Sequence, residues 1–203
     1  MLPARHHWFV DKFFDAYIRF LLNRHFSKIE VEGIWPVTDE SQLVIGNHVS
    51  WWDGFWVYYL NKKLLRKRFY VMMLKQQLER NSILSRIGAF SIDPGSRSVV
   101  KSLAYASDKL KEAGNLLVIY PQGVITSVYA GVPSFKKGLD HIISKSGVKS
   151  VLFYVALTDY FSQKKPVLTF YIGCCHVDGV AHVEDMYREF YHAAVARQAQ
   201  RIS

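Results

Sequence analysis

The chain has 203 residues, enough to bury one sizeable hydrophobic core, and no Gly-, Ser- or Pro-rich stretch divides it into two domains. Half of the residues are hydrophobic and 15% are aromatic, a composition that excludes a disordered chain. The 26 Lys and Arg against 17 Asp and Glu give a net charge of +9. This surplus favours anionic partners, such as acidic lipid headgroups, a phosphate-rich carrier or nucleic acid, without choosing among them.

Cysteine use and hydropathy bear on where the protein works. Cys174 and Cys175 are adjacent, so no disulfide is expected. No run of about 18 apolar residues predicts a membrane span, and the N-terminus lacks the features of a secretory signal. The histidines outside the segment discussed below show no ligand-like spacing, so no metal is predicted. We therefore expect a soluble or peripheral membrane protein.

The first predicted element is an amphipathic helix over residues 8–26. Its predicted apolar face comprises Val10, Phe13, Phe14, Tyr17 and Leu21, and its polar face comprises Asp11, Lys12, Asp15, Arg19 and Asn23. Two interpretations stay open: the helix packs on the core, or it lies in a bilayer interface. Both hold if it covers the core with only part of its face. Residues 1–30 are assigned to this helix and residues 31–203 to the main domain.

Short strands then alternate with helices along the chain. Strands are predicted over residues 43–45, 68–74, 89–92, 116–120, 151–157 and 167–174. Helices are predicted through residues 56–60 and over residues 98–113, 137–146 and 182–200. This alternation is typical of an α/β fold. We predict a single α/β domain with a mostly parallel mixed sheet flanked by helices, preceded by the N-terminal helix.

The most informative segment is residues 46–54 (GNHVSWWDG), directly after the first buried strand. Functional residues collect in loops at the carboxyl ends of such strands. On a continuous helix His48 and Asp53 would point roughly 140° apart, so they meet only if His48 precedes the helix and Asp53 opens it. A neutral imidazole can take a proton from a hydroxyl, and a carboxylate on its other nitrogen fixes the tautomer. The pair is a candidate general base with its orienting partner.

This segment resembles the first motif of the glycerolipid acyltransferase superfamily (1-acylglycerol-3-phosphate acyltransferase-like), in which Asn-His is followed by four residues and Asp. Residues 88–93 (GAFSID), 120–123 (YPQG) and 135–138 (FKKG) resemble the elements that follow, and the resemblance covers residues 31–158. It implies an O-acyltransferase in which His48 is the general base and Asp53 orients it. The implied acyl donor is acyl-CoA or acyl carrier protein, with no other cofactor.

Further residues in these elements are candidate contacts for substrate. They are Asn47, Ser50, Arg97, Gln122, Gly123, Lys136 and Lys137. Backbone amides around Gly123 are expected near the thioester carbonyl, where they would stabilise an oxyanion. The expected acceptor is a hydroxyl of a lyso-lipid or related lipid at the membrane surface. The resemblance thus implies a peripheral protein at the cytoplasmic face of the membrane.

Four departures from the family pattern affect the acceptor prediction. Gln122 stands where Glu is usual, residues 124–125 (VI) where Thr-Arg is usual, and Pro94 where Arg is usual, which leaves Arg97 as a displaced candidate. The fourth block, residues 153–156 (FYVA), lacks its usual Pro. Two departures remove guanidinium groups that would bind a phosphate through two hydrogen bonds. We therefore expect an acceptor less anionic than a glycerol phosphate.

Three rival functions remain open at this point. The loss of Glu at Gln122 and of two Arg positions is compatible with a non-catalytic lipid- or acyl-carrier-binding protein of the same fold. The charge alone suggests a nucleic-acid-binding domain, although no recognised binding motif appears. A thioesterase is the third possibility, because a base that activates a hydroxyl can also activate water.

Overall fold

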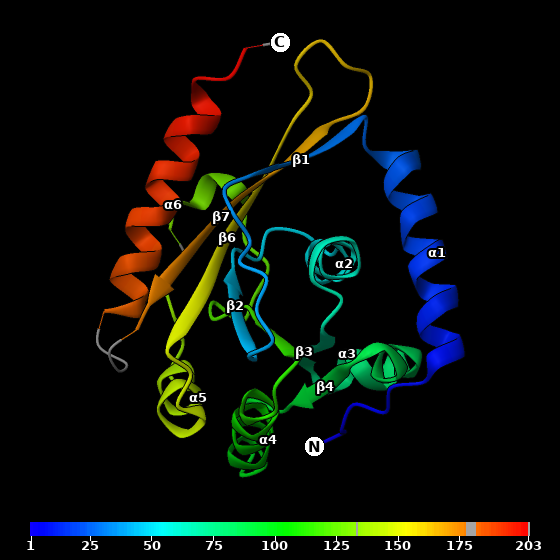
Figure 1. The fold of residues 1–203 in the computed structure, drawn as a ribbon, viewed down its shortest axis with the longest axis vertical. Helices are drawn as coiled ribbons and strands as arrows, with labels where there is room; N and C mark the ends of the chain where they lie inside the picture. Colours follow the sequence, from blue (N-terminus) through cyan, green and yellow to red (C-terminus); the bar gives the residue numbers. More distant parts are fainter. Residues whose placement is uncertain (133, 178–181, 203) are drawn as a thin grey trace.

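The computed structural model, which describes residues 1–132, 134–177 and 182–202, contains a seven-stranded sheet with helices on both faces (Figure 1). The strands are β1 (Lys28–Glu32), β2 (Gln42–Gly46), β3 (Arg68–Leu74), β4 (Ala89–Ile92), β5 (Asn115–Ile119), β6 (Ser150–Asp159) and β7 (Val167–His176). They lie in the order β1-β7-β6-β2-β5-β3-β4. Only β6 and β7 pair in the antiparallel sense, which confirms a mostly parallel mixed sheet.

The helices form two layers on the sheet. They are α1 (Trp8–His25), α2 (Asp53–Leu60), α3 (Lys75–Arg80), α4 (Val99–Lys111), α5 (Leu139–Ser146) and α6 (Val183–Ala199). Alternate strand residues face opposite layers, as the period of two requires. Leu43 and Ile45 of β2 lie in a core with residues of α4, α5 and α6, whereas Val44 lies in a second core with residues of α1 and α2. Figure 1 shows these two layers on either side of the sheet.

Helix α1 packs on the domain through a narrower stripe than predicted. Phe14, Ile18 and Leu22, spaced four residues apart, are its buried residues. Of the predicted apolar face only Phe14 is buried, and Phe13 and Tyr17 face outward. Val10 and Leu21 are half-buried and pack against the same core as Phe14. The assignment was wrong for Phe13 and Tyr17, because aromatic residues surround much of the helix and sequence periodicity did not single out the face that meets the sheet. The helix does cover the core with only part of its surface.

The sequence did not predict strand β1 or the short helices of the connections. These include α3, a π-helical turn η1 (Asn61–Leu65), a 3₁₀ helix η2 (Ser82–Ile87) and a 3₁₀ turn η3 (Val128–Ala130). The other predicted strands and helices are confirmed within about two residues, apart from the start of α2 at Asp53. Before α1, the N-terminal segment runs along the edge strand β4, where Leu2 accepts a hydrogen bond from the backbone of Ser91. This contact covers part of an otherwise open sheet edge.

Candidate active site

The predicted His-Asp pair forms at the carboxyl end of β2. Strand β2 ends at Gly46, a short loop carries His48, and α2 begins at Asp53. The Nδ1 atom of His48 lies 2.8 Å from Oδ2 of Asp53. His48 therefore precedes the helix and Asp53 opens it, which is the arrangement that the spacing required.

The carboxylate of Asp53 is buried and organises the loop around it. Its Oδ2 atom also accepts hydrogen bonds from the backbone N–H groups of Val49 at 2.7 Å and Ser50 at 2.9 Å. Its Oδ1 atom is buried and has no hydrogen-bond partner among the described residues, and burial raises the pKa of Asp53 against the opposing effect of the hydrogen bonds. The His48 side chain is 24% exposed, so the imidazole reaches the surface while its partner does not. This arrangement fixes Nδ1 and leaves Nε2 to act on a substrate.

Asn47 fixes the start of the loop between β2 and α2, which carries His48 and is called the catalytic loop below. Its side-chain amide donates to the carbonyl of Ala156 and its side-chain oxygen accepts from the N–H of Ala156, both at 2.9 Å. The two bonds extend the pairing of β2 with β6 beyond its last pair, Gly46 with Tyr154. Because Asn47 is buried and both polar ends are engaged, its side chain supports the loop from below.

Gln122 connects the loop after β5 to the same histidine. Its Oε1 accepts from the backbone N–H of His48 at 3.1 Å, and its Nε2 lies 2.6 Å from the carbonyl oxygen of His48. Nε2 also lies near the carbonyl of Val124 and the hydroxyl of Thr126. Gln122 is only 5% exposed, so its side chain, like that of Asn47, points at the protein's own backbone.

Two tyrosines line the imidazole, and the sequence analysis did not identify either. The ring of Tyr120 stacks on His48 with centroids 4.4 Å apart and planes 20° apart. The hydroxyl of Tyr154 donates to that of Tyr120 at 3.0 Å, and burial raises the pKa of both tyrosines well above the usual value. Gly46 allows this packing, because a Cβ there would lie 2.1 Å from the Tyr154 ring. The position of Tyr120 directly after strand β5 was a signal that could have found it, whereas Tyr154 lies within β6 and is not marked in this way.

Three of the other predicted contact residues, Ser50, Gly123 and Lys136, belong to loops near the His48–Asp53 pair. Ser50 is in the loop itself. Gly123 has a positive φ of 66°, and Lys136 lies directly over it, because a Cβ on Gly123 would be 3.0 Å from Nζ of Lys136. The N–H of Gly123 already donates to the carbonyl of Tyr120, so this amide is occupied within the turn. The structure thus brings Ser50, Gly123 and Lys136 into the loops around His48.

Three predicted contact residues, Arg97, Lys136 and Lys137, are exposed. Arg97 lies in the connection between β4 and α4, and Lys137 lies just before α5. A lysine that the sequence analysis overlooked, Lys75, directly follows β3, with its ammonium 4.0 Å from the carboxylate of Asp93 after β4. Since β2, β5, β3 and β4 are parallel neighbours, Lys75 and Asp93 follow the same sheet edge as His48.

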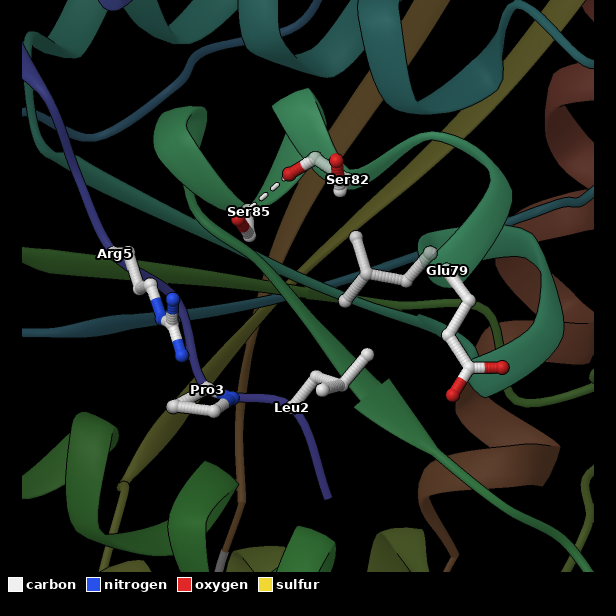
Figure 2. Close-up of a pocket in the computed structure, with 7 residues that line it drawn as sticks. Leu2, Pro3, Arg5, Glu79, Ser82 and Ser85 are labelled. Carbon is white, nitrogen blue, oxygen red and sulfur yellow. Dashed lines mark hydrogen bonds between the residues drawn. The ribbon is translucent and has the colours of Figure 1, made fainter.

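A cavity of about 270 Å³ lies beside the catalytic loop. Its lining is mostly apolar and includes residues of that loop, of α2 and of β6: Phe26, Val49, Ser50, Trp52, Trp56, Val128, Ala156, Thr158, Tyr160 and Pro166. A second hollow of about 260 Å³ lies elsewhere, between the N-terminal segment and the α3–η2 connection (Figure 2). The second hollow contains none of the predicted site residues, so the first is the candidate substrate cavity.

Comparisons with known proteins agree with this geometry. The family model described as Acyltransferase matches residues 28–157. Among solved structures, the chain is similar to the 1-acyl-sn-glycerophosphate (LPA) acyltransferase PlsC from Thermotoga maritima, with a TM-score of 0.67 and 18% identity over 95% of this chain and 80% of that chain. At this identity the likeness shows a shared fold. A search of curated proteins gives no match.

Proposed function

This chain belongs to the acyltransferase family, and we propose that it transfers a fatty acyl group from acyl-CoA or acyl carrier protein to a hydroxyl of a lyso-lipid or related lipid. The observation that carries the proposal is the 2.8 Å contact between Nδ1 of His48 and Oδ2 of Asp53. It orients the imidazole so that Nε2 can serve as a general base.

The proposed reaction is a direct transfer. Nε2 of His48 takes the proton of the acceptor hydroxyl while that oxygen attacks the thioester carbonyl. The C–O bond forms, the C–S bond breaks, and the thiolate leaves and receives the proton from His48. Asp53 keeps the carboxylate form and stabilises the imidazolium between these steps. The ammonium of Lys136, held over Gly123, lies where it can attract the phosphates of the carrier.

The cavity beside the catalytic loop is the proposed site for the acyl chain. Val49 and Ser50 follow His48 directly and form one wall, so a chain in the cavity would bring its carbonyl near the imidazole. The cavity has a volume of about 270 Å³, and seven of its ten lining residues are apolar, which suits a hydrocarbon chain.

The acceptor is proposed to be less anionic than a glycerol phosphate. Positions 124 and 125, where the family pattern has Thr-Arg, carry Val124 and Ile125, and these side chains are about half exposed. Pro94 replaces another Arg, and the displaced Arg97 is exposed. An apolar, guanidinium-poor rim favours a lipid hydroxyl whose neighbouring group has little negative charge, such as that of an amino-acid lipid or a glycolipid.

The outward side of α1 supports a proposed position on the membrane surface. We define the aromatic face of α1 as Phe9, Phe13, Tyr17 and Phe20, all of which are exposed. Trp51, within the catalytic loop, is 67% exposed and makes an edge-to-face contact with Phe55, which in turn contacts Phe14 of α1. Aromatic side chains beside Arg and Lys suit the bilayer interface. Binding there would place His48 near the hydroxyls of membrane lipids.

No helix within residues 1–132, 134–177 and 182–202 combines the length and apolarity of a membrane span.

The test is an assay with radiolabelled acyl-CoA or acyl carrier protein and a panel of lyso-lipids, including lysophosphatidic acid. The expected result is a new acylated lipid and an equal amount of free thiol, with both lost in His48→Ala. Free fatty acid as the sole product would indicate a thioesterase, and binding without turnover would indicate a carrier- or lipid-binding protein. Efficient acylation of lysophosphatidic acid alone would overturn the acceptor proposal.

A further inference from the structure

We propose that Gln122 is a positioning residue, which holds the backbone of His48 in place for the transfer reaction and does not contact the substrate. The inference deepens the proposed function and rests on it. Its starting point is that the side chain of Gln122 binds the backbone N–H and C=O of the same catalytic residue.

The contacts of Gln122 form a bridge between two loops. The two bonds to His48 resemble those between paired strands. Oε1 of Gln122 accepts from the N–H of His48 at 3.1 Å, and Nε2 of Gln122 donates to the carbonyl of His48 at 2.6 Å. Nε2 also lies 2.7 Å from the carbonyl of Val124 and 3.0 Å from the hydroxyl of Thr126. The N–H of Thr126 donates to the same His48 carbonyl at 3.0 Å. Together these bonds fasten the β2 loop to the β5 loop at the peptide of His48.

The bridge requires an amide and cannot be made by an ionised carboxylate. Two of the oxygens near Nε2 belong to carbonyls, which only accept hydrogen bonds. A carboxylate oxygen at the same place would face both carbonyls without a proton to share. The Glu that the family pattern has at this position therefore cannot make the same bridge in its ionised form, and Gln122 gives this chain its own way of fixing the histidine.

The amide also keeps the site at one negative charge. Asp53 is the carboxylate that contacts the imidazole. A second carboxylate at position 122, close to His48, would favour the imidazolium, so a smaller fraction of the protein would begin a cycle with the imidazole unprotonated. A neutral residue at this position therefore suits a histidine that must begin each cycle unprotonated.

The alternative role for Gln122 is a direct contact with substrate. Against it, the side chain is 5% exposed and both of its polar atoms already have partners within the protein. The two roles predict different kinetics, because lost positioning lowers kcat whereas a lost substrate contact raises KM.

The experiment compares Gln122→Met, Gln122→Glu and the control Gln198→Met in the full chain. Gln122→Met keeps the length and removes both bonds to His48, and we expect kcat to fall by about 10²-fold with the KM of each substrate within about threefold. Gln122→Glu is expected to move the acidic limb of the kcat/KM–pH profile to higher pH by about one unit. Gln198→Met removes the side-chain bonds of another buried glutamine, on α6, to the hydroxyl of Tyr171 and the carboxylate of Asp159, and its kcat should stay within about threefold of the parent.

A second readout does not depend on turnover. The proton between Nδ1 of His48 and Asp53 should give a downfield ¹H NMR resonance, identified by its loss in His48→Ala. In folded Gln122→Met this resonance should weaken or shift, whereas Gln198→Met should leave it unchanged. If the parent shows no acyl transfer, the proposed function fails, and this spectrum still decides whether Gln122 positions His48. An unchanged resonance, or a raised KM with unchanged kcat, would overturn the positioning role.

Discussion

Replacing Asn47 with Ala tests whether the Asn47 side chain holds the loop that carries His48 in place, in addition to stabilising the fold. The substitution removes both hydrogen bonds to Ala156 at a position that is 1% exposed. Asn61 offers a matched control, because its side chain makes the same pair of bonds to the backbone of Lys67, at 2.8 and 3.1 Å, and is also fully buried. Asn61 begins η1, at the opposite end of α2 from Asp53.

The expected loss of stability follows from the groups left unpaired. Each substitution strands one buried N–H and one buried C=O, and each such group costs about 1 to 3 kcal/mol. Asn47→Ala and Asn61→Ala should therefore each lower the free energy of unfolding by about 2 to 6 kcal/mol. In a chain of this size that corresponds to a fall in Tm of about 5 to 15 °C.

The two variants should differ in turnover. Thermal unfolding gives the stability of each, and thiol release measured well below both Tm values gives kcat. We expect Asn47→Ala to lose about 10²-fold in kcat because His48 shifts with the loop, and Asn61→Ala to keep the parent value. Equal losses of kcat in the two folded variants, or an unchanged Tm for Asn47→Ala, would refute this reasoning.

Three further predictions concern the carboxylate, the membrane and the acyl chain. Burial raises the folded-state pKa of Asp53, so the folded protein becomes less stable as the pH rises and Asp53 loses its proton. Asp53→Asn should therefore have a higher Tm than the parent at neutral pH and lose this advantage at acid pH. The same variant should lower kcat about 10⁴-fold. A calorimetric pH series showing no Tm difference would contradict the Tm prediction. Replacing both Phe13 and Phe20 with Ser removes roughly 1 to 2 kcal/mol of binding free energy per ring and should weaken binding to anionic vesicles at least tenfold. The control Val100→Ser, at a similarly exposed position on α4, should have no effect. Equal binding by the parent and both variants in a sedimentation assay would count against the aromatic face. Thr158→Trp should partly fill the 270 Å³ cavity from an exposed position and shift the preference toward shorter acyl chains, and an unchanged chain-length profile would argue against that cavity.

The sequence predicted most of the fold because its strands and helices have clear boundaries. Runs such as residues 116–119 (LLVI) are apolar throughout, as expected for a parallel strand buried on both faces. Strand β1 escaped prediction because it lies at the sheet edge and mixes charged with apolar residues. The buried face of α1 was misassigned because its aromatic residues lie on several sides, and only the tertiary packing selects Phe14, Ile18 and Leu22.

The part of the candidate site that lies within one short segment of the chain was predictable from the sequence. The contact of His48 with Asp53 follows from the spacing of the two residues and the strand before them. The partners of Asn47 and Gln122 are 109 and 74 residues away, so no local pattern shows that these side chains bind backbone groups. The stacking of Tyr120 on His48 likewise depends on β2 and β5 being neighbours, which the chain order does not state.

The most direct test of the account is a double-mutant cycle on the catalytic pair. We would measure kcat for acyl transfer in the parent, His48→Ala, Asp53→Asn and the double variant, each shown to be folded by its thermal transition. If Asp53 acts only through His48, the double variant should be no slower than His48→Ala alone. Losses that multiply across the two positions, or appreciable turnover in His48→Ala, would contradict the claim that these residues act as one catalytic unit.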